Sequence, residues 1–210
     1  MKHLVLLGDS VFDNAYYVSA GFDVHNQLQR RLASAWQISL LAKDGSTMSD
    51  IANQLNKLPK DATHLILSVG GNDAILQMGL LDTPIKSVIE AVGLMTNVSA
   101  DFKHRYETLI QSLLKYELPL ILCTIYSPPL SDANLRHAAK GALALYNDCI
   151  LRTAIQNRLP VLDMRLVCTD AEDFSHEIEP SEAGGTKIAA AIERYLTDPE
   201  KAPMYTQVFF

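Results

Sequence analysis

The sequence predicts an α/β fold in which helices cover both faces of a parallel sheet. Short apolar runs alternate along the chain with segments whose apolar residues recur at helical spacing. The apolar runs are continuous rather than interleaved with polar residues, as is typical of strands that are buried on both faces. A chain that repeats strand and helix in this way forms a parallel sheet whose strands are joined by right-handed crossovers.

Short runs rich in Leu, Ile and Val are expected to form the strands of this sheet. These residue types favour strands, and the Gly, Asp, Asn and Ser residues that follow several of the runs favour turns. In chain order, the predicted strands span residues 3–7, 37–42, 64–69, 120–126 and 161–167.

Apolar faces at helical spacing lie between and after these runs, and they predict the covering helices. The faces consist of Ile51, Leu55 and Leu58; of Phe102, Tyr106, Leu109 and Leu113; of Leu143, Tyr146, Ile150 and Ala154; and of Ile188, Ile192, Tyr195 and Leu196. Residues 74–98 are apolar but less regular, because Gly79, Pro84 and Gly93 interrupt them. We expect short helices or a cover over the sheet there.

The composition indicates one globular domain over residues 1–210, since we find no internal repeat, low-complexity tract or linker. A net charge of −6 without a basic stripe argues against a nucleic-acid partner. No apolar stretch is long enough to span a bilayer, and the first apolar run is too short for a secretory signal. The apolar segment 198–210 is expected to pack against its own domain or against a second subunit, which would give a homo-oligomer.

The cysteines Cys123, Cys149 and Cys168 show no C-x-x-C spacing, and an odd number cannot all pair. This usage indicates a reducing, cytoplasmic environment. Each cysteine is expected to be a small buried apolar residue rather than a nucleophile. No Cys-rich or H-E-x-x-H spacing suggests a metal site.

Polar residues follow the predicted strands at the edge where a parallel sheet binds its ligands. Ser10 lies in the segment GDSVFDN after the first strand, Gly45 follows the second, and Asn72 lies in GGND after the third. Asp173 and His176 come after the last strand. A hydroxyl, a glycine amide, a carboxamide, a carboxylate and an imidazole together are the groups that acyl transfer requires.

These motifs, in this order and each after the appropriate strand, resemble those of the SGNH hydrolases, also called GDSL-type esterases and lipases. The resemblance extends from GDSVFDN through Gly45 and GGND to the D-x-x-H near the end of the chain. It implies a three-layer α/β/α fold with a flavodoxin-like, mostly parallel sheet, usually of five strands. It also implies ester hydrolysis through a serine acyl-enzyme, without a metal or an organic cofactor.

Position by position, the resemblance implies that Ser10 is the nucleophile, His176 its general base, and Asp173 the group that orients the imidazole. It implies an oxyanion hole formed by the backbone N–H groups of Ser10 and Gly45 and by the side-chain amide of Asn72. An Asn amide donates a hydrogen bond without carrying charge, and such donors are most effective in a dry, preorganised site. Asp9 and Asp13 are expected to fix the turn around Ser10 through bonds to loop amides.

The chain departs from the family pattern at the opening motif and in the last block. Val11 replaces Leu, an exchange of one apolar residue for another. In the last block Pro180 follows His176 by four residues, which is later than is usual in the family. An alignment anchored on Pro180 instead places Glu177 at the position of the base.

The sequence thus predicts a cytoplasmic serine esterase that acts on small or medium carboxylic esters, or on thioesters. A carbohydrate O-deacetylase and a non-catalytic binding protein that retains the fold are the alternatives. An apolar set after the third strand would either line an acyl pocket or form helix core: Met78, Leu80, Leu81, Leu94 and Met95. Acidic residues between positions 170 and 179 are expected to disfavour anionic substrates.

Overall fold

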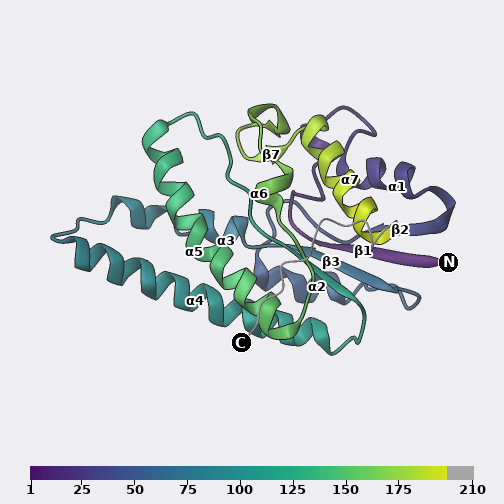
Figure 1. Cartoon of the computed structure of the whole chain (residues 1–210), viewed down its shortest axis with the longest axis horizontal. Coiled ribbons are helices and arrows are strands. Elements are labelled where there is room, and N and C mark those ends of the chain that lie inside the picture. Colours follow the sequence, from purple (N-terminus) through teal and green to yellow (C-terminus); the bar gives the residue numbers. More distant parts are fainter. Residues whose placement is uncertain (198–210) are drawn as a thin grey trace.

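The computed structural model describes residues 1–197, and a five-stranded parallel sheet lies at its centre (Figure 1). The strand order is β2-β1-β3-β4-β5, and all neighbouring strands are parallel. The strands are β1 (Lys2–Gly8), β2 (Trp36–Leu40), β3 (His64–Ser68), β4 (Leu120–Cys123) and β5 (Val161–Leu162). The predicted fold class, a flavodoxin-like parallel sheet between two helical layers, is confirmed.

Helices cover the two faces of the sheet because successive strand residues point to opposite sides. Leu4 and Leu6 of β1 pack with the apolar sides of α1 (Val24–Leu32) and α7 (Glu182–Thr197). Val5 and Leu7 face the other way, toward α2 (Ile51–Leu55), α4 (Val88–Leu114) and α5 (Ala133–Asn157). Figure 1 shows α4 and α5 side by side and reaching well beyond the sheet, with α1 and α7 together at the opposite side.

The last two strands are shorter than predicted. Residues 164–167, expected to extend the fifth strand, form the single helical turn α6 (Met164–Val167). Asp163 caps this turn, since its side chain accepts a hydrogen bond from the backbone N–H of Arg165. The hydroxyl of Thr124, just after β4, also donates to Asp163, at 2.7 Å. The pairing of β4 and β5 ends at Cys123 and Leu162, directly before these two residues.

Residues 74–98 form short helices and the beginning of a long one. They comprise the end of α3 (Gly71–Ile75), the 3₁₀ turn η4 (Met78–Asp82) and the first part of α4. The expected short helices are therefore present, but regular helix already begins at Val88, where Ser87 accepts a hydrogen bond from the N–H of Glu90. Leu76, Val88 and Ile89 are exposed on this segment.

The remaining elements are short. They are the 3₁₀ turns η1 (Ala15–Tyr17), η2 (Ala33–Ala35), η3 (Met48–Asp50) and η5 (Ala171–Asp173), and the hairpin strands β6 (Phe174–Ser175) and β7 (Glu179–Pro180). All three cysteines are free and buried, as predicted. Within residues 1–197, no helix combines the length and the apolarity needed to cross a membrane. The segment 198–210 and its predicted packing lie outside the described residues, and the cytoplasmic location stays a prediction.

Candidate active site

Ser10 lies in a tight turn directly after β1. The backbone N–H groups of Phe12 and Asp13 donate to the carbonyl oxygen of Asp9 at 3.2 and 3.1 Å, and the N–H of Val11 donates to the Asp9 carboxylate at 3.2 Å. Asp9 therefore fixes the turn, as expected. In the described part of the chain, the N–H of Ser10 donates to no other atom. The turn thus leaves one backbone donor free beside the Ser10 hydroxyl.

The loop after β2 lies against this turn. The N–H of Lys43 donates to the Gly8 carbonyl at 3.0 Å, and the N–H of Asp44 donates to the Asp13 carboxylate at 2.9 Å. Directly after these anchors Gly45 adopts a φ of +77°, a conformation that glycine reaches without strain. Its N–H has no hydrogen-bond partner among residues 1–197.

Asn72, in the first turn of α3, reaches the same loop. Its side-chain amide donates to the carbonyl oxygen of Ser46 at 2.9 Å, which fixes the orientation of the amide. A carboxamide nitrogen carries two N–H groups, so one further donor is left. The neighbouring Asp73 is buried, and its carboxylate accepts from the N–H of Met48 and from Arg105, at 3.0 and 2.9 Å. These bonds hold α3 against the loop that contains Gly45.

The hairpin of β6 and β7 completes the site. Asn14, the last residue of GDSVFDN, is fully buried and donates to the Pro180 carbonyl at 3.0 Å. On the other side of the hairpin, the Tyr126 hydroxyl donates to the Ile178 carbonyl at 2.7 Å. These two bonds clamp the hairpin over the turn of Ser10 and bring the Glu179 side chain to the Ser10 hydroxyl, with which it interacts.

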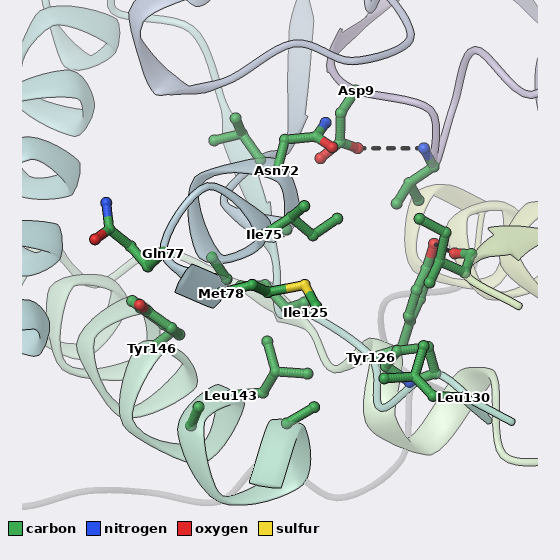
Figure 2. Close-up of a pocket in the computed structure, with 18 of the residues that line it drawn as sticks. Asp9, Asn72, Ile75, Gln77, Met78, Ile125, Tyr126, Leu130, Leu143 and Tyr146 are labelled. Carbon is green, nitrogen blue, oxygen red and sulfur yellow. Dashed lines mark hydrogen bonds between the residues drawn. The ribbon is translucent and has the colours of Figure 1, made fainter. Parts of the chain in front are cut away.

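An apolar cavity of about 330 Å³ opens beside Ser10 (Figure 2). Asp9 and Asn72 lie at one end of the view, and Leu143 and Tyr146 of α5 lie at the other. Four of the five residues named as a possible acyl pocket line it: Met78, Leu80, Leu81 and Met95. Leu94 lies instead in a neighbouring, more polar depression with Asn97, Asp101 and Arg105.

Burial dominates the electrostatics of this cavity. Asp9 is 4% exposed, and burial, with smaller contributions from Glu179 and Asp73, raises its pKa to about 7. The pKa of Glu179 is also raised, mainly by burial. The interaction of Glu179 with the Ser10 hydroxyl and the nearby His176 act in the opposite direction and lower this pKa. Glu177, Glu179 and Asp9 all line the cavity, and no Lys, Arg or His does so among the described residues. The cavity is therefore largely apolar, and the ionisable residues of its lining are acidic.

Residues 6–186 match the model of the GDSL-like Lipase/Acylhydrolase family. This range includes the turn of Ser10, the Gly45 loop, α3 and the hairpin, so the match covers every segment of the site. The chain belongs to the GDSL-like lipase/acylhydrolase family. Members of this family hydrolyse ester bonds, and the protein is an ester-bond hydrolase.

Solved structures of a phospholipase, a lipase/acylhydrolase and an acetyl xylan esterase share the fold. The chain aligns with phospholipase A1 from Streptomyces albidoflavus at 16% identity and a TM-score of 0.66, over 91% of this chain and 98% of that one. It aligns with the lipase/acylhydrolase from Enterococcus faecalis at 22% identity and a TM-score of 0.63, over 93% and 95%. The acetyl xylan esterase AlAXEase gives 16% identity and a TM-score of 0.66, over 90% and 97%. Comparison with curated protein sequences gives no match.

The structure does not form the Asp173–His176 pair that the GDSL motif predicts. Asp173 is buried, but its carboxylate accepts from the Lys187 ammonium at 2.8 Å and from the N–H groups of Thr169 and Asp170 at 3.0 Å. His176 begins the turn between β6 and β7 with a φ of +47°, is exposed, and packs against the Tyr17 ring at 5.5 Å between centroids. In the chain, strand β6 lies between Asp173 and His176.

Glu179 is the site residue that the GDSL motif did not reveal. In the sequence, Glu179 stands out only as one of the acidic residues at positions 170–179. The alternative base that the sequence predicts is Glu177. Glu177 is exposed, although it lines the cavity, and its carboxylate accepts from the N–H of Ser131 at 3.0 Å. Glu179 immediately precedes Pro180 and is paired across the hairpin with Ser175. Its position directly before Pro180 is the sequence signal that could have found it.

Proposed function

We propose that the protein is a serine esterase that cleaves neutral carboxylic esters of medium acyl length, with Ser10 as the nucleophile. The observation that carries this proposal is the position of the Ser10 hydroxyl, at the edge of an apolar cavity and beside free backbone N–H groups. As Ser10 attacks the ester carbonyl, negative charge develops on the carbonyl oxygen. The N–H groups of Ser10 and Gly45 and the Asn72 amide are the donors that would stabilise it.

The cavity supports an acyl chain longer than acetyl. Its volume of about 330 Å³ lies at the lower end of the range for small-molecule sites, roughly 300–1,000 Å³. Each methylene buried in it would contribute about 0.8 kcal/mol. Acetyl-group removal from a carbohydrate is the second candidate, and the fold shared with an acetyl xylan esterase favours it. The two candidate functions predict different trends: kcat/KM rises with acyl length for the first and not for the second.

A series of p-nitrophenyl acetate, butyrate and octanoate tests both candidates. We expect kcat/KM to rise from acetate to octanoate, whereas an O-deacetylase would prefer acetate. Ser10→Ala should lower kcat by about 10⁴- to 10⁶-fold, as in other enzymes with a serine nucleophile. A fluorophosphonate probe should label wild type at Ser10 alone. Full activity of Ser10→Ala, or labelling elsewhere, would contradict the assignment of the nucleophile.

A further inference from the structure

Glu179 is the ionisable side chain that interacts with the Ser10 hydroxyl. It is 7% exposed, its interaction with that hydroxyl lowers its pKa, and it lines the cavity with Ser10. One of its carboxylate oxygens, Oε2, is buried and has no hydrogen-bond partner. An unpaired buried carboxylate oxygen is costly and is rarely kept without a role. Here the side chain that carries it lines the same cavity as Ser10.

His176 is less well placed for that role. It is exposed and does not line the cavity, and its imidazole forms no hydrogen bond within residues 1–197. The Asp173 carboxylate that was expected to orient it is occupied by Lys187. A general base must lie within hydrogen-bond reach of the proton that it accepts. Of His176 and Glu179, only Glu179 lines the cavity with Ser10 and interacts with its hydroxyl.

We propose that Glu179, rather than His176, is the general base of the reaction; this inference rests on the proposed function. Glu179 accepts the Ser10 proton as the serine oxygen forms its bond to the acyl carbon. When the tetrahedral intermediate collapses, the bond to the alcohol oxygen breaks and Glu179 returns the proton to that oxygen. A water molecule then gives its proton to Glu179 and attacks the acyl-enzyme. The released serine oxygen takes this proton back.

The environment of Glu179 suits a carboxylate that carries a proton between steps. An ordinary carboxylate is a weak base near neutral pH, and burial raises the pKa of Glu179 toward the range where it accepts a proton readily. The nearby Asp44 also raises the pKa of Glu179, whereas His176 lowers it. The side chains of Asn14 and Tyr126 donate to the backbone carbonyls on either side of Glu179, those of Pro180 and Ile178, and so hold its backbone in place.

The test compares Glu179→Gln, Glu179→Asp and His176→Gln with wild type, each checked for folding by thermal melting. Glu172→Gln is the matched control, because Glu172 is an exposed acid just before the hairpin whose side chain makes no hydrogen bond to any residue of the described range 1–197. The kcat/KM values for p-nitrophenyl octanoate and ethyl octanoate report acylation with a good and with a poor leaving group. Rates of fluorophosphonate labelling report the reactivity of Ser10.

We expect Glu179→Gln to lose at least about 10²-fold in kcat/KM, the lower range for a lost general base. The loss should be larger for ethyl octanoate, whose alcohol must be protonated as it leaves, and labelling of Ser10 should slow. Glu179→Asp should retain part of the activity. His176→Gln should lose less than about fivefold, the effect of one exposed charge. Glu172→Gln should behave as wild type.

The proposal is overturned if Glu179→Gln stays within about fivefold of wild type, the range that an exposed charge spans. The proposal is also overturned if Glu179→Gln lowers kcat/KM equally for p-nitrophenyl octanoate and ethyl octanoate, since a purely structural role of Glu179 would give that result. Inactive wild type, or active Ser10→Ala, would instead refute the proposed function. If esterase activity is lost in Ser10→Ala but retained in Glu179→Gln, the result refutes the role of Glu179 and leaves the proposed function standing.

Discussion

Replacing Asp9 with Asn should change how the stability of the protein depends on pH. Asp9 is buried, and its pKa is raised from 3.8 to about 7, mainly by loss of solvation. The folded protein therefore holds this proton at pH values where the unfolded chain has already released it. Unfolding releases a proton between pH 3.8 and about 7, so the contribution of Asp9 to stability falls as pH rises through this window.

The magnitude follows from the width of the window. The window is about three pH units wide, and each unit changes the free energy of unfolding by about 1.4 kcal/mol, so the total contribution of Asp9 is at most about 4 kcal/mol. Between pH 5 and pH 8, the wild type should lose about 2–3 kcal/mol more than Asp9→Asn, because part of the effect is already lost below pH 5. The Asn side-chain oxygen can still accept the bond from the Val11 N–H, so the turn is retained.

Urea unfolding at the two pH values measures this difference. Trp36 is the single tryptophan and is 4% exposed, so its fluorescence reports the loss of the core. The pH dependence that arises from other groups is common to both proteins and cancels when the variant is compared with wild type. Parallel loss of stability in wild type and Asp9→Asn between pH 5 and pH 8 would refute the reasoning.

Further predictions concern the oxyanion donor Asn72, the packing beside Asp173, and the charge of the substrate. Asn72→Ala should lower kcat by about 10²- to 10³-fold with little change in KM; a raised KM with unchanged kcat would indicate a binding role. Gly184→Ala should cost about 1–3 kcal/mol by thermal melting, because its Cβ would lie 2.1 Å from the Asp173 carbonyl oxygen. Gly141→Ala, with open space, should not destabilise the fold. Esters with a carboxylated acyl chain should react more slowly than neutral ones, most clearly at low salt; equal rates would contradict an effect of the acidic residues in the cavity lining.

The Asn72 amide and the Ser10 turn illustrate how local signals can predict a site. Strand and helix follow from hydrophobic spacing, which depends on neighbours in the sequence. Parallel strands bring their carboxyl ends to one edge, so the residues after β1, β2 and β3 had to meet there. The turn chemistry of GDSVFDN and GGND is equally local. For these reasons the fold class and the grouping of Ser10, Gly45 and Asn72 could be predicted from the sequence.

The last block could not be predicted in the same way, because its geometry depends on contacts between distant residues. The bond from Asn14 to Pro180 joins positions 166 apart, and the bond from Tyr126 to Ile178 joins positions 52 apart. These bonds, with the pairing of Ser175 and Glu179, leave His176 exposed at the turn and bury Glu179. Burial in turn sets the pKa of the carboxylate, a property that no local motif specifies. The sequence by itself determined the sheet and the placement of Ser10; only the tertiary structure decided which ionisable group of the hairpin lies beside it.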